Sequence, residues 1–160
     1  MKEIVKTLQI LLKSESELTA DERTMVEAAK EATLRSYSPY SHFSVGAAVM
    51  LENGELLTGN NQENCAYPSG LCAERTTIFY ANSRYPDTPI ETLCIAARDS
   101  SGRFTSKPIS PCGACRQVIL ESEHRHHHPI RILLYGTDGI YCIDSARDLL
   151  PFCFDSDDLT

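Results

Sequence analysis

Three cysteines and one glutamate stand in the sequence at spacings that suit metal chemistry. Cys112 and Cys115 lie three residues apart in PCGACRQ, and Cys72 and Glu74 lie two residues apart in LCAER. Residues three apart share one face of a helix, so Cys112 and Cys115 can bind one ion, with Cys72 as a third ligand. Three protein ligands leave the fourth tetrahedral position of a zinc ion open, which is typical of a catalytic site.

Glu74 would lie beside that open position without being a ligand. A zinc ion lowers the pKa of a coordinated water, and a neighbouring carboxylate can accept and pass on protons. Taken alone, Glu74 is more commonly explained as an acid in the first turn of a helix, where the helix dipole favours it. The two thiols of PCGAC alone could be buried side chains or half of a structural zinc site. Only the combination of both motifs in one chain favours a catalytic centre.

Both cysteine motifs fall where helices are predicted to begin. One helix is predicted from near Cys72 through Tyr80. A second is predicted from Ser110 as N-cap and Pro111 at the first position, through Leu120. The free N–H groups and the dipole at a helix N-terminus stabilise a thiolate, which is the form that binds metal.

The remaining segments alternate between helix and strand patterns. Helices are predicted over 1–13, over 25–32 after a capping box formed by Thr19 and Glu22, and over 146–150. Strands are predicted over 45–51, 55–58, 92–97, 130–135 and 140–143. The first of these strands is almost continuously apolar and is expected to be buried on both faces. This order predicts an α/β sandwich with a partly parallel sheet.

Length and charge restrict the function further. A chain of 160 residues with 42% hydrophobic and 23% charged residues is expected to form one globular domain over 1–160. A net charge of −7 argues against binding to nucleic acid, which depends on patches of Lys and Arg. No apolar run reaches the length of a membrane span, and the N-terminal segment does not have the pattern of a signal peptide. Seven cysteines, an odd number, favour a reducing cytoplasm over a disulfide framework.

Four segments together resemble one enzyme family. They are SPYSHFSVGAAV (38–49), NQENCAYPSGLCAER (61–75), SPCGACRQV (110–118) and DLLPFCFDSDDL (148–159). The motif P-C-x-x-C with an upstream glutamate is the signature of zinc nucleobase deaminases. The sequence resembles the small form of cytidine deaminase, which has three cysteine ligands. The likeness extends from about the second helix to the C-terminus.

This resemblance implies a fold, a reaction and a cofactor. The implied fold is a three-layer α/β/α sandwich with a mixed, mostly five-stranded sheet. The implied reaction is hydrolysis of cytidine and deoxycytidine to uridine and deoxyuridine, with release of ammonia. One Zn²⁺ per chain would be held by Cys72, Cys112 and Cys115. The zinc-activated water would attack C4 of the base while Glu74 moves the protons.

Substrate contacts are also implied by the resemblance. Asn61 and Glu63 match a ribose-binding pair, Phe43 matches an aromatic residue that lines the pocket, and the backbone of Ala73 would contact the base. Residues two apart on an extended segment point the same way, so Asn61 and Glu63 could both reach one sugar. Without the resemblance, Asn61 and Glu63 would be part of a polar loop and Phe43 part of the core.

The family form is a homotetramer in which neighbouring subunits complete each pocket. By resemblance, Tyr67 and Phe154 would reach into an adjacent subunit's site, although the apolar run 149–154 could equally belong to the core of its own chain. Three thiolates give a zinc site a net negative charge, so Arg75 is expected to offset it. A surface ion pair is the alternative role for Arg75.

Two other functions remain open at this point. The same chemistry could serve a related aminonucleoside such as blasticidin S, or the fold could carry a zinc-binding assembly protein without activity. The segment with His124 and His126, His127 and His128 is interpreted as a solvated loop. Four other cysteines are interpreted as small apolar residues: Cys65, Cys94, Cys142 and Cys153. The N-terminal helix over 1–13 has no assigned role.

Overall fold

The computed structural model of the protein describes residues 1–159. A mixed six-stranded sheet forms the centre, in the order β1-β6-β5-β4-β2-β3. The strands are β1 (Leu11–Lys13), β2 (Ser44–Leu51), β3 (Leu56–Asn60), β4 (Ile90–Arg98), β5 (Arg131–Gly136) and β6 (Gly139–Ile143). The helices are α1 (Ala20–Ala32), α2 (Ala73–Arg84) and α3 (Gly113–His126). Short 3-10 turns occupy Glu15–Glu17, Thr33–Arg35, Tyr67–Ser69, Ala146–Asp148 and Ser156–Leu159.

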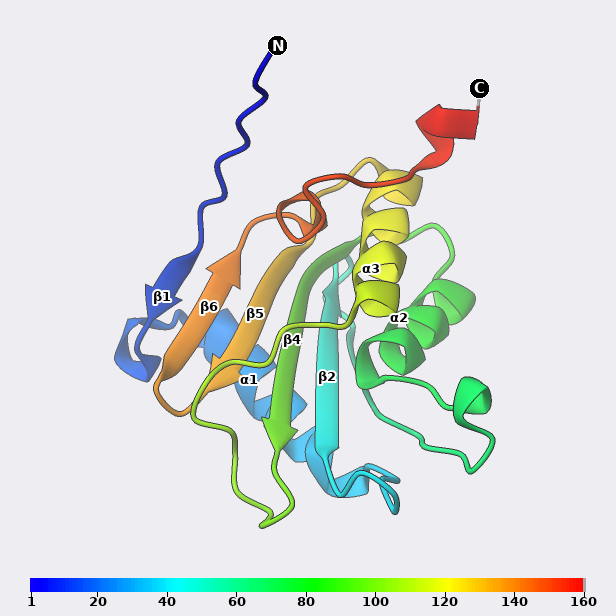
Figure 1. The fold of residues 1–160 in the computed structure, drawn as a ribbon. Helices are drawn as coiled ribbons and strands as arrows, with labels where there is room; N and C mark the ends of the chain where they lie inside the picture. The colour runs from blue at the N-terminus through cyan, green and yellow to red at the C-terminus, as the bar shows by residue number, and fades with distance from the viewer. Residues whose placement is uncertain (160) are drawn as a thin grey trace.

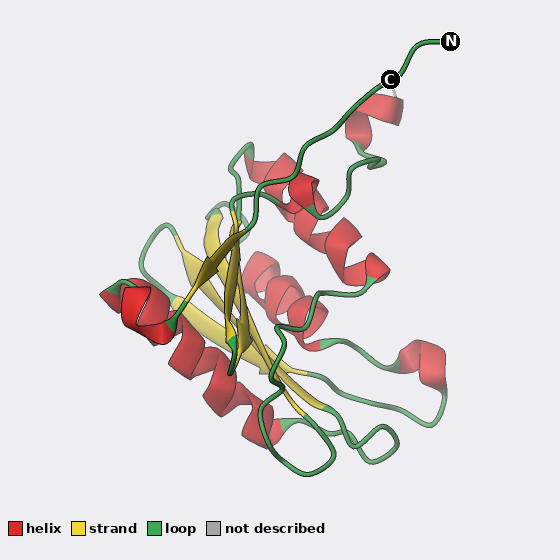
Figure 2. Ribbon diagram, turned by 60° about the vertical axis from the view of Figure 1, so that its left-hand side comes forward, coloured by secondary structure: helices red, strands yellow, loops and turns green. Residues whose placement is uncertain are grey.

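Helices cover both faces of this sheet, which confirms the predicted α/β sandwich. Helix α1 lies on one face, and α2 and α3 lie together on the other (Figures 1 and 2). Only the β4–β5 pair is parallel, and every other pairing of strands among residues 1–159 is antiparallel. The expected five strands are therefore one too few, because β1 adds a sixth at the edge.

Alternation along the central strands builds two separate cores. Ala47, Val49 and Leu51 of β2 point to the core under α2 and α3, whereas Ala48 points to the core under α1. The prediction that this strand is buried on both faces is confirmed. Gly46 allows α1 to approach β2 closely, since a Cβ there would stand 2.2 Å from a carbonyl oxygen of α1.

The four cysteines outside the motifs have different environments. Cys94 and Cys142 are buried in the core under α1, as predicted for small apolar residues. Cys153 is half-buried and packs against the other core. Cys65 is exposed in the loop between β3 and α2, so the prediction is wrong for this residue. Connecting loops run over the protein surface, which leaves this thiol exposed.

The helix predicted over 1–13 is wrong. Residues 1–10 have no regular structure, and Leu11–Lys13 form β1, which pairs antiparallel with β6. An isolated helix of this length is marginal in water, and Ile4 and Leu8 find no core to cover them, being 75% and 45% exposed. The amine of Lys13 instead lies 2.8 and 2.9 Å from the two carboxylate oxygens of buried Glu22, which attaches β1 to the start of α1.

One more helix prediction and one loop interpretation need correction. The segment 146–150 forms only one 3-10 turn, Ala146–Asp148. The loop interpretation of the histidine segment is wrong for His124 and His126, which lie in the last turns of α3. It holds for His127, the left-handed C-cap, and for His128, which follows the helix. The buried Glu123 carboxylate explains this extension. It accepts hydrogen bonds from the amides of Ile130 and Ala146, both at 2.7 Å, and so packs the helix end onto the following segments.

Strand direction places the starts of α2 and α3 at the same end of the sheet, where β3 and β4 finish. β2 pairs antiparallel with both β3 and β4, so β3 and β4 run in the same direction. Helix α2 follows β3 and α3 follows β4. Both helices therefore begin near the carboxyl ends of these strands, where ligands bind in open α/β sheets. In residues 1–159, no helix combines the length and apolar character required to cross a bilayer.

Candidate active site

The three cysteines of the two motifs meet at this end of the sheet. Cys72 Sγ lies 3.8 Å from Cys112 Sγ, and Cys112 Sγ lies 3.5 Å from Cys115 Sγ. All three sulfur atoms lie within 4.8 Å of one another, and none is in a disulfide. Zn–S bonds of about 2.3 Å in a tetrahedral site require S···S separations of roughly 3.8 Å. The donor set and its spacing therefore fit one zinc ion.

Local helix geometry explains how the thiols converge. Cys72 and Cys112 are the N-cap residues of α2 and α3, both with extended backbone, and Cys115 lies in the first turn of α3. The predicted N-cap at Ser110 is thus wrong by two residues, because the carbonyl of Cys112 accepts the first helical bond from Arg116 at 2.9 Å. A thiol at the cap lies at the positive end of the helix dipole, which favours its thiolate form.

The cluster holds negative charge at neutral pH. A hydrogen bond from the Cys115 thiol is the largest cause that lowers the pKa of Cys72 to about 5, and Arg75 contributes to the same shift. The shared proton in turn raises the pKa of Cys115. A metal ion binds the thiolate form of cysteine, so metal binding at this cluster is coupled to proton release.

Glu74 lies in the first turn of α2, directly beside the thiols. Its side chain is buried, with the residue only 5% exposed. Burial is the main cause that raises the pKa of this carboxyl, and the negative charge of Cys72 raises it further. A carboxyl whose pKa is shifted toward neutrality can act both as acid and as base.

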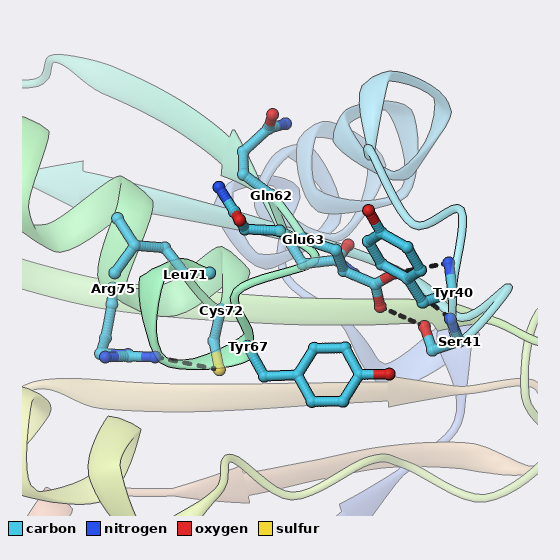
Figure 3. Close-up of a pocket in the computed structure, with 11 residues that line it drawn as sticks. Tyr40, Ser41, Gln62, Glu63, Tyr67, Leu71, Cys72 and Arg75 are labelled. Carbon is cyan, nitrogen blue, oxygen red and sulfur yellow. Dashed lines mark hydrogen bonds between the residues drawn. The ribbon is translucent and has the colours of Figure 1, made fainter.

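Arg75 is directed at the same cluster. Its Nη2 atom lies 3.7 Å from Cys72 Sγ (Figure 3). Its Nε atom is buried and has no hydrogen-bond partner among residues 1–159. The guanidinium therefore places a positive charge beside the sulfur of Cys72.

A pocket of about 460 Å³ opens next to Cys72. This volume lies within the range of small-molecule sites. Side chains from the turn before β2 and from the segment 61–75 surround it (Figure 3). The lining residues are Tyr40, Ser41, Asn61, Gln62, Glu63, Asn64, Tyr67, Gly70, Leu71, Cys72 and Arg75. Four predicted site residues besides Cys72 thus share one cavity with it: Asn61, Glu63, Tyr67 and Arg75.

Other predicted residues do not line this cavity. Phe43 is half-buried, and its carbonyl oxygen accepts a hydrogen bond from Asn61 Nδ2 at 2.9 Å. Ala73 is fully buried as the first residue of α2, where its amide has no acceptor within the helix. Phe154 is 59% exposed at the far end of the chain, and its carbonyl oxygen accepts a hydrogen bond from Gln117.

Several lining residues carry no signal of their own in the sequence. Tyr40 and Ser41 come from the turn before β2, and Gln62 and Leu71 face each other across the loop before α2 through two backbone hydrogen bonds of 2.9 Å. Their types are ordinary for polar loops. Only the likeness of segments 38–49 and 61–75 to a known family indicates a binding role for this part of the chain.

Comparisons with known proteins agree with this geometry. A family model described as "Cytidine and deoxycytidylate deaminase zinc-binding region" matches residues 19–128. A relative named cytidine deaminase from Sporosarcina psychrophila is 37% identical over 140 residues, covering 88% of this chain and 96% of the relative. A cytidine deaminase from Mycobacterium tuberculosis is 37% identical over 134 residues, covering 82% of this chain and 87% of the relative.

Solved structures show the same similarity. The crystal structure of cytidine deaminase from Burkholderia pseudomallei aligns with a TM-score of 0.71 and 36% identity, covering 86% of this chain and 100% of that chain. The cytidine deaminase structure from Mycobacterium tuberculosis aligns with a TM-score of 0.65 and 31% identity, covering 86% of this chain and 99% of that chain. All of them are similar to this chain over most of both lengths.

Proposed function

Because this chain belongs to the cytidine and deoxycytidylate deaminase family, we propose that it hydrolyses cytidine and deoxycytidine to uridine and deoxyuridine, releasing ammonia. One arrangement carries this proposal: the three-thiol cluster, the buried Glu74 and a nucleoside-sized pocket meet at the same end of the sheet. The product would return to the uracil nucleoside pool, as in pyrimidine salvage.

Zinc is the cofactor that fits the site. Cys72, Cys112 and Cys115 would hold it, and their spacing matches a tetrahedral thiolate site. When bound, zinc acts as a Lewis acid that activates water at neutral pH. Arg75 would offset the charge of the three sulfur ligands through its contact with Cys72.

Glu74 is proposed to move the protons. Its carboxyl would accept a proton from the attacking water and donate one to N3 of the base as C4 becomes tetrahedral. It would then take the proton of the new hydroxyl group on C4 and deliver it to the departing amino group, so that water and cytidine yield uridine and ammonia. The raised pKa of Glu74 supports this role, because a group that must both accept and donate works best with a pKa near neutrality.

The pocket is proposed to bind the substrate through its sugar and its base. Asn61 and Glu63 would contact the ribose, the backbone of Ala73 would contact the base, and Phe43 would pack beside the ring. The net charge of −7 and the ionised Glu63 favour a neutral nucleoside over a nucleotide, because the phosphate would be repelled.

A homotetramer with shared pockets is proposed for the assembly. Tyr67 and Phe154 are 77% and 59% exposed in the isolated chain, and exposed aromatic side chains are enriched where subunits meet. All seven cysteines are unpaired, which supports a reducing, cytoplasmic location. Light scattering on the purified protein measures the proposed mass of four chains.

A substrate panel tests the proposed reaction. Cytidine, deoxycytidine, dCMP, blasticidin S and guanine are each incubated with protein of measured zinc content. We expect turnover of the two cytosine nucleosides at one zinc per chain. Turnover of blasticidin S alone would assign the same chemistry to a different substrate. A zinc-loaded protein that converts none of the five compounds would contradict the proposal and favour an assembly role.

A further inference from the structure

The carboxylate of Glu63 is fixed from one side by the turn that precedes β2. The amide of Tyr40 donates to Glu63 Oε2 at 2.9 Å, and the amide of Ser41 donates to the same oxygen at 3.2 Å. The Ser41 hydroxyl donates a short hydrogen bond to the other oxygen, Oε1 (Figure 3). Three donors on two oxygens determine both the position and the plane of this carboxylate.

The turn itself has a restrained backbone. The amide of His42 donates to the carbonyl of Ser38 at 3.0 Å, and the amide of Phe43 donates to Ser41 Oγ at 3.1 Å. His42 adopts a left-handed conformation with φ of 53°, which a non-glycine residue keeps only when the surroundings impose it. The turn held in this way presents two amides and one hydroxyl to Glu63.

Asn61 ties the other end of the turn to the same segment. Its Oδ1 atom accepts hydrogen bonds from Ser36 Oγ at 2.6 Å and from the amide of Val45 at 2.8 Å. Its Nδ2 atom donates to the carbonyl of Phe43 at 2.9 Å. Segments 36–45 and 61–63 are therefore locked together in the chain before any substrate enters.

We infer that Ser41 is a positioning residue that fixes Glu63 as the acceptor for one sugar hydroxyl of the substrate. This inference rests on the proposed nucleoside deaminase function. An ionised carboxylate is an acceptor only and offers about four lone-pair sites. The turn occupies three of them, which leaves one for a hydroxyl donor from the pocket.

Two further observations support this role. The Ser41 hydrogen bond is the largest cause that lowers the pKa of Glu63, so the carboxylate stays ionised and cannot donate. Ser41 is also exposed and lines the pocket, so its hydroxyl has no part in either core. A substrate that lacks the sugar hydroxyls gains nothing from this arrangement, because it leaves the remaining acceptor site empty.

Steady-state kinetics on two substrates test the inference. Cytidine carries the sugar hydroxyls, and 2′,3′-dideoxycytidine keeps the base but lacks both of them. For Ser41→Ala we expect KM for cytidine to rise about tenfold with kcat within about twofold, since only binding is affected. KM for the dideoxy substrate should stay within about twofold of wild type. Ser41→Thr, which keeps a hydroxyl, should restore binding of cytidine.

A matched control exists elsewhere in the chain. Ser101 also donates its hydroxyl to a carboxylate, that of Asp99, at 2.5 Å, but it lies outside the pocket. Ser101→Ala should leave both KM values unchanged. In the Glu63→Gln background, Ser41→Ala should add no further loss, because the hydroxyl acts through Glu63.

The outcomes separate this inference from the function on which it rests. Failure of the wild-type protein to deaminate cytidine would overturn both. If the wild type is active and Ser41→Ala keeps its KM for cytidine within twofold, only the positioning role is refuted. Equal losses on both substrates would also refute it, since that pattern indicates a general disturbance of the pocket.

Discussion

Replacing Glu74 by glutamine separates proton transfer from structure in this site. Glu74→Gln keeps nearly the same volume in a position that is 5% exposed, so packing is preserved. The amide cannot accept and release a proton. General acid–base catalysis contributes about 10²- to 10⁴-fold, which corresponds to roughly 2.7–5.4 kcal/mol of transition-state stabilisation. We therefore expect kcat to fall at least about a hundredfold.

The same substitution should stabilise the metal-free protein at neutral pH. Burial, and then the charge of Cys72, raise the pKa of Glu74 above its ordinary value of 4.5. A carboxyl whose pKa is higher in the folded than in the unfolded protein favours folding fully at pH values below its unfolded pKa. This contribution to the free energy of unfolding is lost as pH rises through the folded pKa. Each unit by which folding raises the pKa lowers the free energy of unfolding of the wild type by about 1.4 kcal/mol at neutral pH. Glutamine avoids this cost.

Three measurements test the catalytic and the electrostatic role of Glu74. Absorbance follows the conversion of cytidine to uridine, elemental analysis gives zinc per chain, and thermal unfolding of metal-free protein is compared at pH 7 and pH 4. We expect full zinc, lost turnover, and a higher Tm of the variant at pH 7 that converges with wild type at pH 4. A loss of kcat below tenfold at full zinc content would remove Glu74 from the mechanism. An unchanged Tm difference between the two pH values would refute the electrostatic reasoning.

Three further predictions concern the metal and the fold. Cys112→Ala should lose both zinc and activity in a metal assay, whereas Cys94→Ala, which removes a thiol from the core under α1, should keep its zinc. Gly46→Ala should destabilise the protein by about 1–3 kcal/mol in chemical denaturation, because its Cβ would lie 2.2 Å from a backbone oxygen. Gly113→Ala, with open space around it, is the control. Burial opposes the ionisation of Glu22, but its cationic partners and a helix amide outweigh this and lower its pKa. Glu22→Gln should therefore be less stable than wild type at pH 7, with the difference shrinking as pH falls below 4.5.

Local features of this chain could be predicted from the sequence because they depend on neighbours in the chain. The capping box of Thr19 and Glu22 is present, with Glu22 N at 3.2 Å from Thr19 Oγ1. Strand β2 is buried on both faces, as its continuous apolar run indicates. The thiols that were expected to meet do so, and Glu74 lies buried beside them.

Other features depend on partners distant in the sequence. Segment 1–13 has an amphipathic pattern, but apolar residues such as Ile4 and Leu8 stay exposed; its end joins the sheet as β1, and residues 1–10 have no regular structure. The pattern at 124–128 suggests a loop, but α3 continues to His126. Hydrogen bonds from the amides of Ile130 and Ala146 to Glu123 stabilise this helix end. Helical periodicity shows which face of a segment is apolar and does not show whether anything will cover that face.

The pocket shows most clearly the difference between features that the local sequence determines and features that depend on distant residues. The residue types and the spacing of Cys72, Glu74, Cys112 and Cys115 were enough to indicate zinc chemistry. The fixing of Glu63 by Ser41 joins residues 22 positions apart through hydrogen bonds that no periodic pattern encodes. Ligand types and helix starts are local properties, and one chain segment determines each. The direction of β3 and β4, which brings the thiols together, and the turn that holds Glu63 arise only when strands pair and loops close.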